Sequence, residues 1–383
     1  MENNESFMKI LLRMLSYVLV AALASAATWF LAARVPDSKL EELADVIDRK
    51  FIAEADQTAI QDAAAEAMVD ALGDQWSYYI PAALQSNYDE RRSNEYVGIG
   101  VSVMARQDGA GYDIVAVTAG GPAEEAGILP GDIATHADGK ALSGLNVTEV
   151  RALIMGKEGT SVKLTVLRDG QSLEIAVTRK TIRTKVAEGR MLAGNIGYIT
   201  IANFFDHAGE ESIEAAKSLV EAGAEALIFD VRDNPGGYVH EMVKILDHLL
   251  PEGPLFRSVS YSGKETVEES DAACVELPMA VLINGNTYSA AEFFAAALSE
   301  YDWAVTVGEQ TSGKGYYQTA HTFSDGSGVS LSTGKYTTPN GVSLAEAGGL
   351  TPDIPTAPAE GKVEAEEDPQ ILAAIAALSS QNQ

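Results

Sequence analysis

The chain has 383 residues, enough for two or three domains that each bury a core. Its 27 Lys and Arg stand against 55 Asp and Glu, and the resulting formal charge of −28 argues against nucleic acid as a partner. The single cysteine, Cys274, excludes an internal disulfide framework, and the five histidines have no metal-ligand spacing. We therefore expect neither a metal ion nor another cofactor.

An uncharged run extends from Met14 to Ala33, after two basic residues. The run is about as long as a helix that spans a bilayer. Residues 24–26, Ala-Ser-Ala, resemble a signal-peptidase site, but the apolar residues continue beyond them. We expect residues 1–36 to form an uncleaved, single-pass signal anchor in the cell membrane, with the following domains outside the cytoplasm. A cleaved signal peptide and a buried soluble helix are the alternatives.

Apolar residues next recur at helical spacing within residues 40–51 and 60–72, and Gly73 stops the second pattern. We therefore assign residues 37–92 to a small helical segment.

Short strands with alternating polarity dominate residues 93–180. The expected strands are Tyr112–Val117, Ser161–Leu167 and Leu173–Thr178, with one short helix near Thr148–Ile154. Such a module is close to the smallest size that folds alone.

The start of this module carries Gly98 and Gly100 on either side of Ile99, in the sequence Tyr-Val-Gly-Ile-Gly-Val. Glycines free the backbone so that its N–H groups can face a ligand such as a chain terminus. With the later sequences GPAEEAGI and LPGDI, residues 93–180 resemble a PDZ domain in bacterial circular order. The resemblance implies that a peptide C-terminus binds beside Gly98, Ile99 and Gly100. A PDZ-like fold without a ligand is the alternative.

Strands and helices alternate from residue 181 onwards. The expected strands are Ile196–Phe204, Ala226–Val231, Ala280–Asn284 and Ala304–Gly308, and the expected helices are Glu210–Glu221, Tyr238–Leu250 and Ala290–Leu298. This alternation predicts an α/β layer with largely parallel strands over residues 181–358, with its functional groups at the carboxyl ends of the strands.

Residues 359–383 are expected to form an acidic linker and a C-terminal helix. Four apolar residues lie on one side of that helix: Ile371, Leu372, Ile375 and Leu378. The pattern indicates packing against the rest of the chain or a contact in a homodimer.

The sequence Asn234-Pro-Gly-Gly237 follows a buried strand and precedes a helix. One interpretation is a simple strand-to-helix turn. The other is that Gly236 and Gly237 let backbone N–H groups approach a developing oxyanion at a helix N-terminus. The turn alone does not decide between them.

Ser289 also has two interpretations. With Glu292 three residues later, it has the pattern of a capping box at a helix start. A serine hydroxyl at the positive end of a helix is also where a nucleophile would stand next to a backbone donor.

Lys314 lies between two glycines, a pattern more typical of a surface loop. The loop is not a phosphate-binding loop, because the glycine spacing is wrong. To act as a base the lysine must lose its proton near neutral pH. Its pKa must then fall from about 10.4 to about 7, a change worth about 4.6 kcal/mol that burial of an unpaired ammonium can supply. Neighbouring residues contribute no carboxylate, although Glu309 lies five residues upstream.

These motifs together resemble the C-terminal processing peptidases of serine peptidase family S41, over about residues 38–378. The match also includes LSTGKYTTPNG and GGLTPDI near the end of the chain. The resemblance implies a ClpP/crotonase-like peptidase core and a serine endopeptidase that cleaves exported or membrane-associated proteins near their C-termini.

The resemblance also implies roles for individual residues. Ser289 would be the nucleophile, Lys314 its general base, and Gln318 the residue that orients the lysine. The oxyanion would bind the backbone N–H of Ala290 and that of Gly236 or Gly237.

Two positions depart from the family pattern. Met155 stands where the family often has an arginine, so the resemblance does not establish arginine-mediated coupling between the PDZ groove and the active site. Whether the groove activates the enzyme or only tethers substrate is left open. Ser312 stands where an aromatic residue commonly precedes the lysine, which predicts looser packing there.

Two other functions compete with this assignment. One is a PDZ-bearing scaffold protein with a silent α/β domain, although the intact set of Ser289, Lys314 and Gln318 argues against it. The other is a serine hydrolase that uses His240, which lies near the Asn-Pro-Gly-Gly turn.

Overall fold

The computed structural model describes residues 14, 16–23, 25, 38–361 and 363–381. These residues belong to two compact units that divide between Leu72 and Gly73. Most of the predicted signal anchor lies outside the described residues. Among those that are described, no helix is both long enough and apolar enough to cross a bilayer.

Two helices form the described part of the first unit from residue 38 onwards: α2 (Lys39–Lys50) and α3 (Gln57–Asp70). Each starts at a side-chain cap, because Ser38 Oγ and Asp56 Oδ1 accept backbone N–H groups of the first turns. Both match the helical spacing in the sequence, and α3 ends just before Gly73.

The second unit begins with β1 (Tyr78–Ile80) and α4 (Ala82–Ser93) and continues into the PDZ-like module. The elements of that module are β2 (Glu95–Gly98), β3 (Val101–Ala105), β4 (Tyr112–Val117), α5 (Pro122–Glu125), β5 (Ile133–Ala137), β6 (Lys140–Ala141), α6 (Val147–Ile154), β7 (Ser161–Arg168), β8 (Gln171–Thr178) and β9 (Lys180–Arg183). Five of its strands run in the order β3-β4-β5-β7-β8, with β6 paired to β5, and β2 pairs separately with β9. The inner face buries Ile114, Leu164 and Val166, as strand alternation predicts.

A six-stranded sheet forms the centre of the larger domain, in the order β10-β11-β12-β15-β16-β19. Its strands are β10 (Ala187–Leu192), β11 (Ile196–Ile201), β12 (Ala226–Asp230), β15 (Met279–Ile283), β16 (Ala304–Gly308) and β19 (Ile354–Pro355). Only the β10–β11 pair among these is antiparallel. The predicted layer of largely parallel strands is therefore confirmed.

Helices cover both faces of this sheet: α7 (Ala208–Glu221), α8 (Val239–Leu249), α9 (Ala290–Glu300) and α11 (Pro369–Gln381). Phe229 and Val281 belong to the core shared with α7, α8 and α9, whereas their strand neighbours Ile228 and Leu282 pack with α11. Both faces are buried, which explains the continuous apolar strands. The C-terminal helix thus packs within its own chain, and the homodimer stays a prediction.

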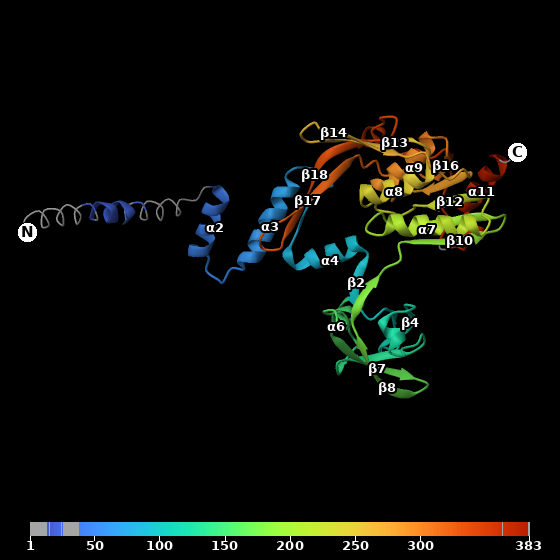
Figure 1. The fold of residues 1–383 in the computed structure, drawn as a ribbon. Coiled ribbons are helices and arrows are strands. Elements are labelled where there is room, and N and C mark those ends of the chain that lie inside the picture. The colour runs from blue at the N-terminus through green and yellow to red at the C-terminus, as the bar shows by residue number, and fades with distance from the viewer. Residues whose placement is uncertain (1–13, 15, 24, 26–37, 362, 382–383) are drawn as a thin grey trace, which may run out of the picture. The chain divides into compact units, whose positions relative to one another are not determined.

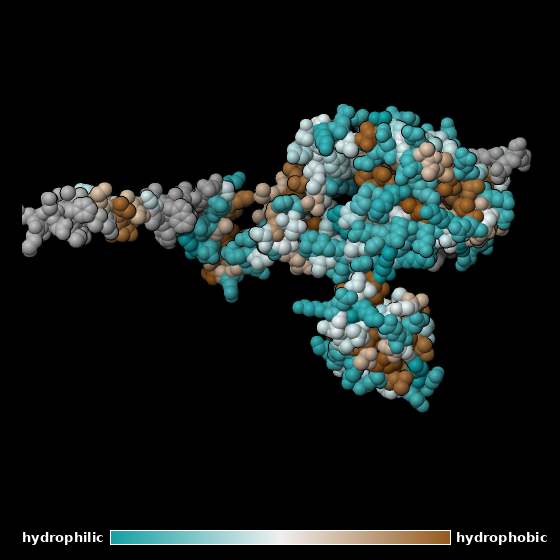
Figure 2. All heavy atoms as spheres, in the orientation of Figure 1, coloured by the Kyte–Doolittle hydropathy of each residue, from teal (hydrophilic) through white to brown (hydrophobic). Residues whose placement is uncertain are grey.

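The sequence did not predict a second, antiparallel sheet in this domain. This second sheet contains β1, β13 (Gly253–Ser260), β14 (Glu265–Ser270), β17 (Tyr316–Thr322) and β18 (Gly328–Thr337). The long β18 pairs with β1, β13 and β17, and β17 and β18 lie side by side in Figure 1. Two short helical turns, α10 (Leu344–Ala347) and η1 (Ala365–Glu367), complete the described part of the domain. Hydrophilic residues cover most of the face of this unit seen in Figure 2, in keeping with the net negative charge.

Candidate active site

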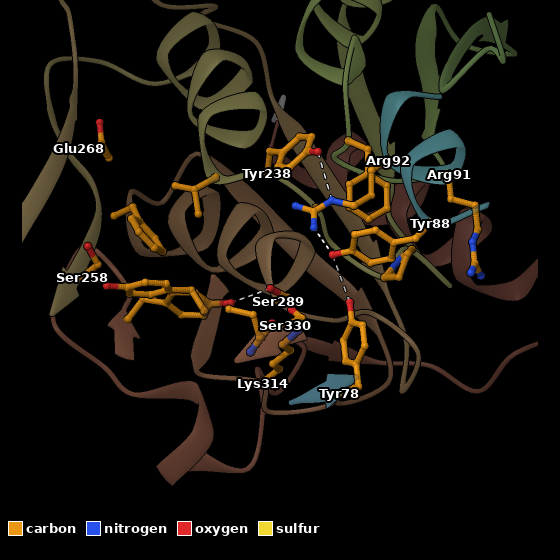
Figure 3. Close-up of a pocket in the computed structure, with 18 residues that line it drawn as sticks. Tyr78, Tyr88, Arg91, Arg92, Tyr238, Ser258, Glu268, Ser289, Lys314 and Ser330 are labelled. Atoms are coloured by element: carbon orange, nitrogen blue, oxygen red, sulfur yellow. Dashed lines mark hydrogen bonds between the residues drawn. The ribbon is translucent and has the colours of Figure 1, made fainter. Parts of the chain in front are cut away.

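A cavity of about 700 Å³ lies where the parallel sheet, α4 and the antiparallel sheet meet. Its lining includes Ser289, Lys314 and Gln318, three residues that the sequence singled out. Gly237 and Tyr336 also line it, and Figure 3 shows Ser289 and Lys314 close together in it. The fold therefore brings the predicted nucleophile, base and one oxyanion glycine to the same cavity.

Ser289 stands at the N-cap of α9 with φ 54° and ψ −125°. A positive φ is uncommon for a residue with a Cβ and marks a strained position. Gly236 permits it: a Cβ added there would lie 2.8 Å from Ser289 Cβ. The glycine of the Asn-Pro-Gly-Gly turn thus makes room for the serine, which is itself only 8% exposed.

The hydrogen bonds of Ser289 separate its two predicted roles. Its backbone N–H donates to Glu292 Oε2 at 2.8 Å, which is the carboxylate half of a capping box. Its hydroxyl lies 2.6 Å from the hydroxyl of Tyr336, and the backbone N–H of Glu292 donates to the backbone carbonyl of Ser289. The serine hydroxyl is therefore not the sole acceptor for the N–H of Glu292 at the helix start.

Tyr336 lies on β18 and has a buried side chain between Phe293 and Phe256. Burial raises the pKa of its hydroxyl, while the hydrogen bond to Ser289 lowers it. The phenol therefore stays protonated and can donate to the serine oxygen. No sequence signal assigned Tyr336 to the site, although it lies inside the LSTGKYTTPNG motif.

Glu292 is a fully buried carboxylate that links Ser289 to the loop that carries Lys314. Besides Ser289 N–H, its oxygens accept four hydrogen bonds from that loop: from the hydroxyls of Thr311 (2.5 Å) and Ser312 (3.1 Å) and from the backbone N–H groups of Gly313 (2.7 Å) and Lys314 (3.0 Å). Five donors offset the cost of burying the charge. Ser312 therefore donates to the same carboxylate as its neighbours, and looser packing around Lys314 stays a prediction.

Lys314 has the environment that a general base needs. Burial lowers the pKa of its ammonium from 10.5 to about 8, against the attraction of Glu292 and Asp74, which raises it. Both carboxylates come from distant parts of the chain, which local sequence could not reveal. Lys314 Nζ lies 4.8 Å from the centre of the Trp76 ring. Within the described residues, no hydrogen bond joins this nitrogen to Ser289 Oγ.

A short segment before β1 lies beside Lys314. Asp74 accepts hydrogen bonds from the backbone N–H of Trp76 (3.1 Å) and the hydroxyl of Ser77 (2.5 Å), and Ser77 Oγ accepts the N–H of Ser332 on β18. The Trp76 ring also meets Tyr288 edge to face, with centroids 6.1 Å apart. One indole thus contacts both the lysine and the turn before the nucleophile, a contact that no sequence signal indicated.

The two candidate oxyanion glycines have different surroundings. Gly236 N–H donates to Asn234 Oδ1 at 2.8 Å, so this donor is used inside its own turn. Gly237 lines the cavity, with φ +155° and a position so close to Phe204 that a Cβ would clash. The backbone N–H of Tyr288 donates to Asn234 O at 3.0 Å and ties this turn to the nucleophile's turn. Ala290 follows Ser289 as the first residue of α9.

Gln318 lines the cavity, but its Nε2 donates to Tyr316 O at 3.0 Å and to Ser332 Oγ at 3.2 Å. Its predicted contact with Lys314 therefore stays a prediction. His240 lies elsewhere: its side chain is 63% exposed, stacks on Tyr238 and lies 3.3 Å from Glu241. Because His240 is not among the residues that line the cavity, the structure does not support the alternative Ser–His mechanism.

The predicted peptide-binding residues lie at the edge of the PDZ-like module. Gly98 pairs with Lys180 between β2 and β9, and Gly100 has φ +78°, which favours glycine. Ile99 is 1% exposed and packs in the core of the module, so its side chain does not face a groove. Any ligand contact here must use backbone groups.

Met155 ends α6, and its sulfur accepts a hydrogen bond from Arg151 Nε at 2.8 Å. Arg151 also forms an ion pair with Glu90 of α4 at 3.3 Å. A direct polar link between the PDZ-like module and α4 is therefore present one helical turn before the departure at Met155.

Ser289 is a strained serine at the N-terminus of a helix that packs on a parallel sheet, and the domain with this sheet is joined to a PDZ-like module. This combination is that of a PDZ-containing serine peptidase. Residues 195–356 match the profile of peptidase family S41, and residues 114–168 match that of the PDZ domain. The chain belongs to peptidase family S41.

Named relatives agree with this membership. The chain is 35% identical over 351 residues to the carboxy-terminal processing protease CtpA of Bacillus subtilis (strain 168), covering 87% of this chain and 75% of the relative. It is 31% identical over 322 residues to a CtpA-like serine protease of Staphylococcus aureus (strain COL), covering 83% of this chain and 64% of that protein. A crystal structure described as an S41 protease from Bacteroides fragilis shares the fold, with a TM-score of 0.51 at 16% identity and coverage of 84% and 91%.

Proposed function

We propose that this peptidase attacks the substrate carbonyl with Ser289, uses Lys314 as its general base, and cleaves exported or membrane-associated proteins near their C-termini. The observation that carries the proposal is the lowered pKa of Lys314, about 8, in the cavity that also contains Ser289. A lysine in this state supplies a neutral amine near physiological pH, as a Ser–Lys mechanism requires.

The proposed reaction has two steps. Neutral Lys314 accepts the hydroxyl proton of Ser289 as the oxygen attacks the scissile carbonyl, and the backbone N–H groups of Gly237 and Ala290 bind the oxyanion. The ammonium then returns the proton to the leaving amine, which leaves an acyl-enzyme. Water, deprotonated by the same lysine, hydrolyses the ester and releases Ser289. For the first step the serine hydroxyl must direct its proton towards Lys314, while Tyr336 can remain a donor to the same oxygen.

Cleavage of an unfolded protein by the full chain tests this assignment. Ser289→Ala and Lys314→Ala are expected to abolish cleavage, whereas His240→Gln is expected to retain it. Circular dichroism would confirm that each variant is folded. Cleavage by Ser289→Ala equal to that of the parent chain would remove the peptidase assignment and leave the silent scaffold protein as the alternative.

We further propose that the PDZ domain binds the substrate C-terminus through backbone groups beside Gly98, Ile99 and Gly100. Two observations at Gly100 support this. Its positive φ favours glycine, and an added Cβ there would lie 3.1 Å from Thr118 Cβ. Binding of a fluorescent peptide to the uncleaving Ser289→Ala chain is expected to weaken when Gly100→Ala is added. Unchanged affinity would contradict this role.

The uncharged run from Met14 to Ala33 supports a membrane anchor that keeps the peptidase outside the cytoplasm. Fractionation of cells that express the full chain is expected to place it in the membrane, and deletion of residues 1–36 to release it. Release of the full chain by high salt would instead indicate peripheral attachment.

A further inference from the structure

Arg92, at the end of α4, is a half-buried cation in the catalytic cavity. It lines the cavity together with Ser289, and Figure 3 shows its guanidinium between Tyr88 and Tyr238, on the side that faces the cavity. Its Nε donates to the hydroxyl of Tyr238 at 3.1 Å, and its Nη1 donates to the hydroxyl of Tyr88.

Three aromatic rings fix the plane of this guanidinium. The Arg92 Cζ atom lies 4.8 Å from the ring centre of Tyr238, 5.0 Å from that of Tyr88 and 5.8 Å from that of Phe205. Such cation–π contacts stabilise an arginine that has left water. They also hold its planar fork in one orientation, which lowers the entropy cost of binding a planar anion.

Arg92 has no acidic partner. Its polar neighbours are tyrosine hydroxyls, and no ion pair of the described residues includes it. This is unexpected in a chain with twice as many acidic as basic residues, where a partly buried charge is normally paired. Of the five N–H donors of a guanidinium, two are used, so three remain for a ligand.

Arg92 lies next to the turn that carries one of the proposed oxyanion donors. Tyr238, which accepts its hydrogen bond, directly follows Gly237, the glycine proposed for the oxyanion. Arg92 therefore lies beside the turn that carries Gly237, in the same cavity as Ser289. In Figure 3, Glu268 lies across the same cavity from Arg92. A peptide in the cavity thus meets a positive end and a negative end.

We propose that Arg92 binds a carboxylate of the peptide substrate within the cleft, close to the bond that is cut. This inference rests on the proposed function and adds a substrate class to it. The carboxylate is either the terminal group of a chain cut very near its end or the side chain of an Asp or Glu beside the cut. Both offer the planar pair of oxygens that a guanidinium binds bidentately.

Matched peptides distinguish these sources. The site of cleavage in an unfolded protein is mapped by mass spectrometry, and peptides around it are made in three forms: with a free C-terminus, with a C-terminal amide, and as the amide with a Glu next to the cut. The full chain is compared with Arg92→Gln, Arg92→Lys and Arg190→Gln. Arg190 is a matched control, because it is an exposed arginine that contacts Tyr198 and does not line the cavity.

For the parent chain we expect KM to be about 10- to 100-fold lower for a carboxylate-bearing peptide than for the plain amide. Arg92→Gln should abolish that difference, so that the carboxylate-bearing peptides and the plain amide have the same KM. Arg92→Lys keeps the charge without the fork and should retain part of the preference, which also tests the idea if the glutamine variant does not fold. Arg190→Gln should behave like the parent.

Three results would overturn the proposal. The first is equal KM values of the parent chain for all three peptides. The second is a carboxylate preference that survives Arg92→Gln and therefore resides elsewhere, such as the PDZ groove. The third is an equal loss of activity of Arg92→Gln on every peptide, which would assign Arg92 a structural role. If the parent chain prefers only the peptide with the free C-terminus, Arg92 binds the terminal carboxylate. If it prefers only the peptide with Glu, Arg92 binds the side-chain carboxylate. Failure of the proposed function would look different, because Ser289→Ala would then still cleave.

Discussion

The pH dependence of cleavage tests the assignment of Lys314 most directly. At pH 7 a lysine with a pKa of 10.5 is neutral in about one molecule in three thousand, whereas a pKa of about 8 makes roughly one in eleven neutral. Burial in the cavity thus increases the reactive fraction by roughly 300-fold. We expect kcat/KM to rise about tenfold per pH unit between pH 6 and pH 7.5 and to level off above pH 8 to 9.

The assay measures initial rates of peptide cleavage by the full chain from pH 6 to pH 10, with a check that the protein remains folded at each value. A profile that levels off near pH 6.5 would indicate a histidine base, and one that still rises at pH 10 would indicate an exposed lysine. Either outcome would refute the argument from burial. His240→Gln is the control variant and is expected to keep the profile of the parent.

The same pKa shift predicts an effect on stability that does not depend on catalysis. Between about pH 8 and pH 10.5 the unfolded lysine keeps its proton while the folded one has lost it, so the free energy of unfolding rises with pH in this window. The full rise is worth about 3 kcal/mol at most. Urea unfolding of the inactive Ser289→Ala chain should show this rise, and adding Lys314→Met should remove it.

Three further variants test the surroundings of the site. Tyr336→Phe removes the hydroxyl 2.6 Å from the nucleophile and should lower kcat about tenfold with KM unchanged, whereas an unchanged kcat would show that this contact is dispensable. Trp76→Leu removes the ring that lies over Lys314 Nζ and should move the pKa of the kcat/KM profile upwards as water enters. Trp303→Leu is the control, because the Trp303 ring is not paired with Lys314, and it should leave this pKa unchanged. Gly236→Ala should cost about 1–3 kcal/mol of unfolding free energy and abolish cleavage, because its Cβ would collide with the nucleophile's turn. Gly285→Ala, with its nearest neighbour at 3.9 Å, is the matched control, and equal stability of the two would contradict the steric argument.

Much of the fold could be predicted because its elements are encoded locally. The strand Tyr112–Val117 coincides with β4, and the apolar runs near residues 226 and 280 became β12 and β15. The antiparallel sheet was missed because its strands, such as β14 with the sequence ETVEES, show little apolar alternation. Their pairing depends on partners far away in the chain, which single-segment patterns do not describe.

The sequence by itself determined the membership of the chain in its family and the identity of Ser289 and Lys314 as candidates, because their motifs are short and contiguous. Only the tertiary structure decided what surrounds them. Glu292, expected only as a helix-capping residue, also accepts hydrogen bonds from the loop that carries Lys314. Tyr336, 47 residues after the serine, became its hydrogen-bond partner. Local propensity places residues on helices and strands, but burial and close contact arise only when distant segments pack. This packing lowers the pKa of Lys314. It also places Arg92 in the cavity beside tyrosine hydroxyls and without an acidic partner.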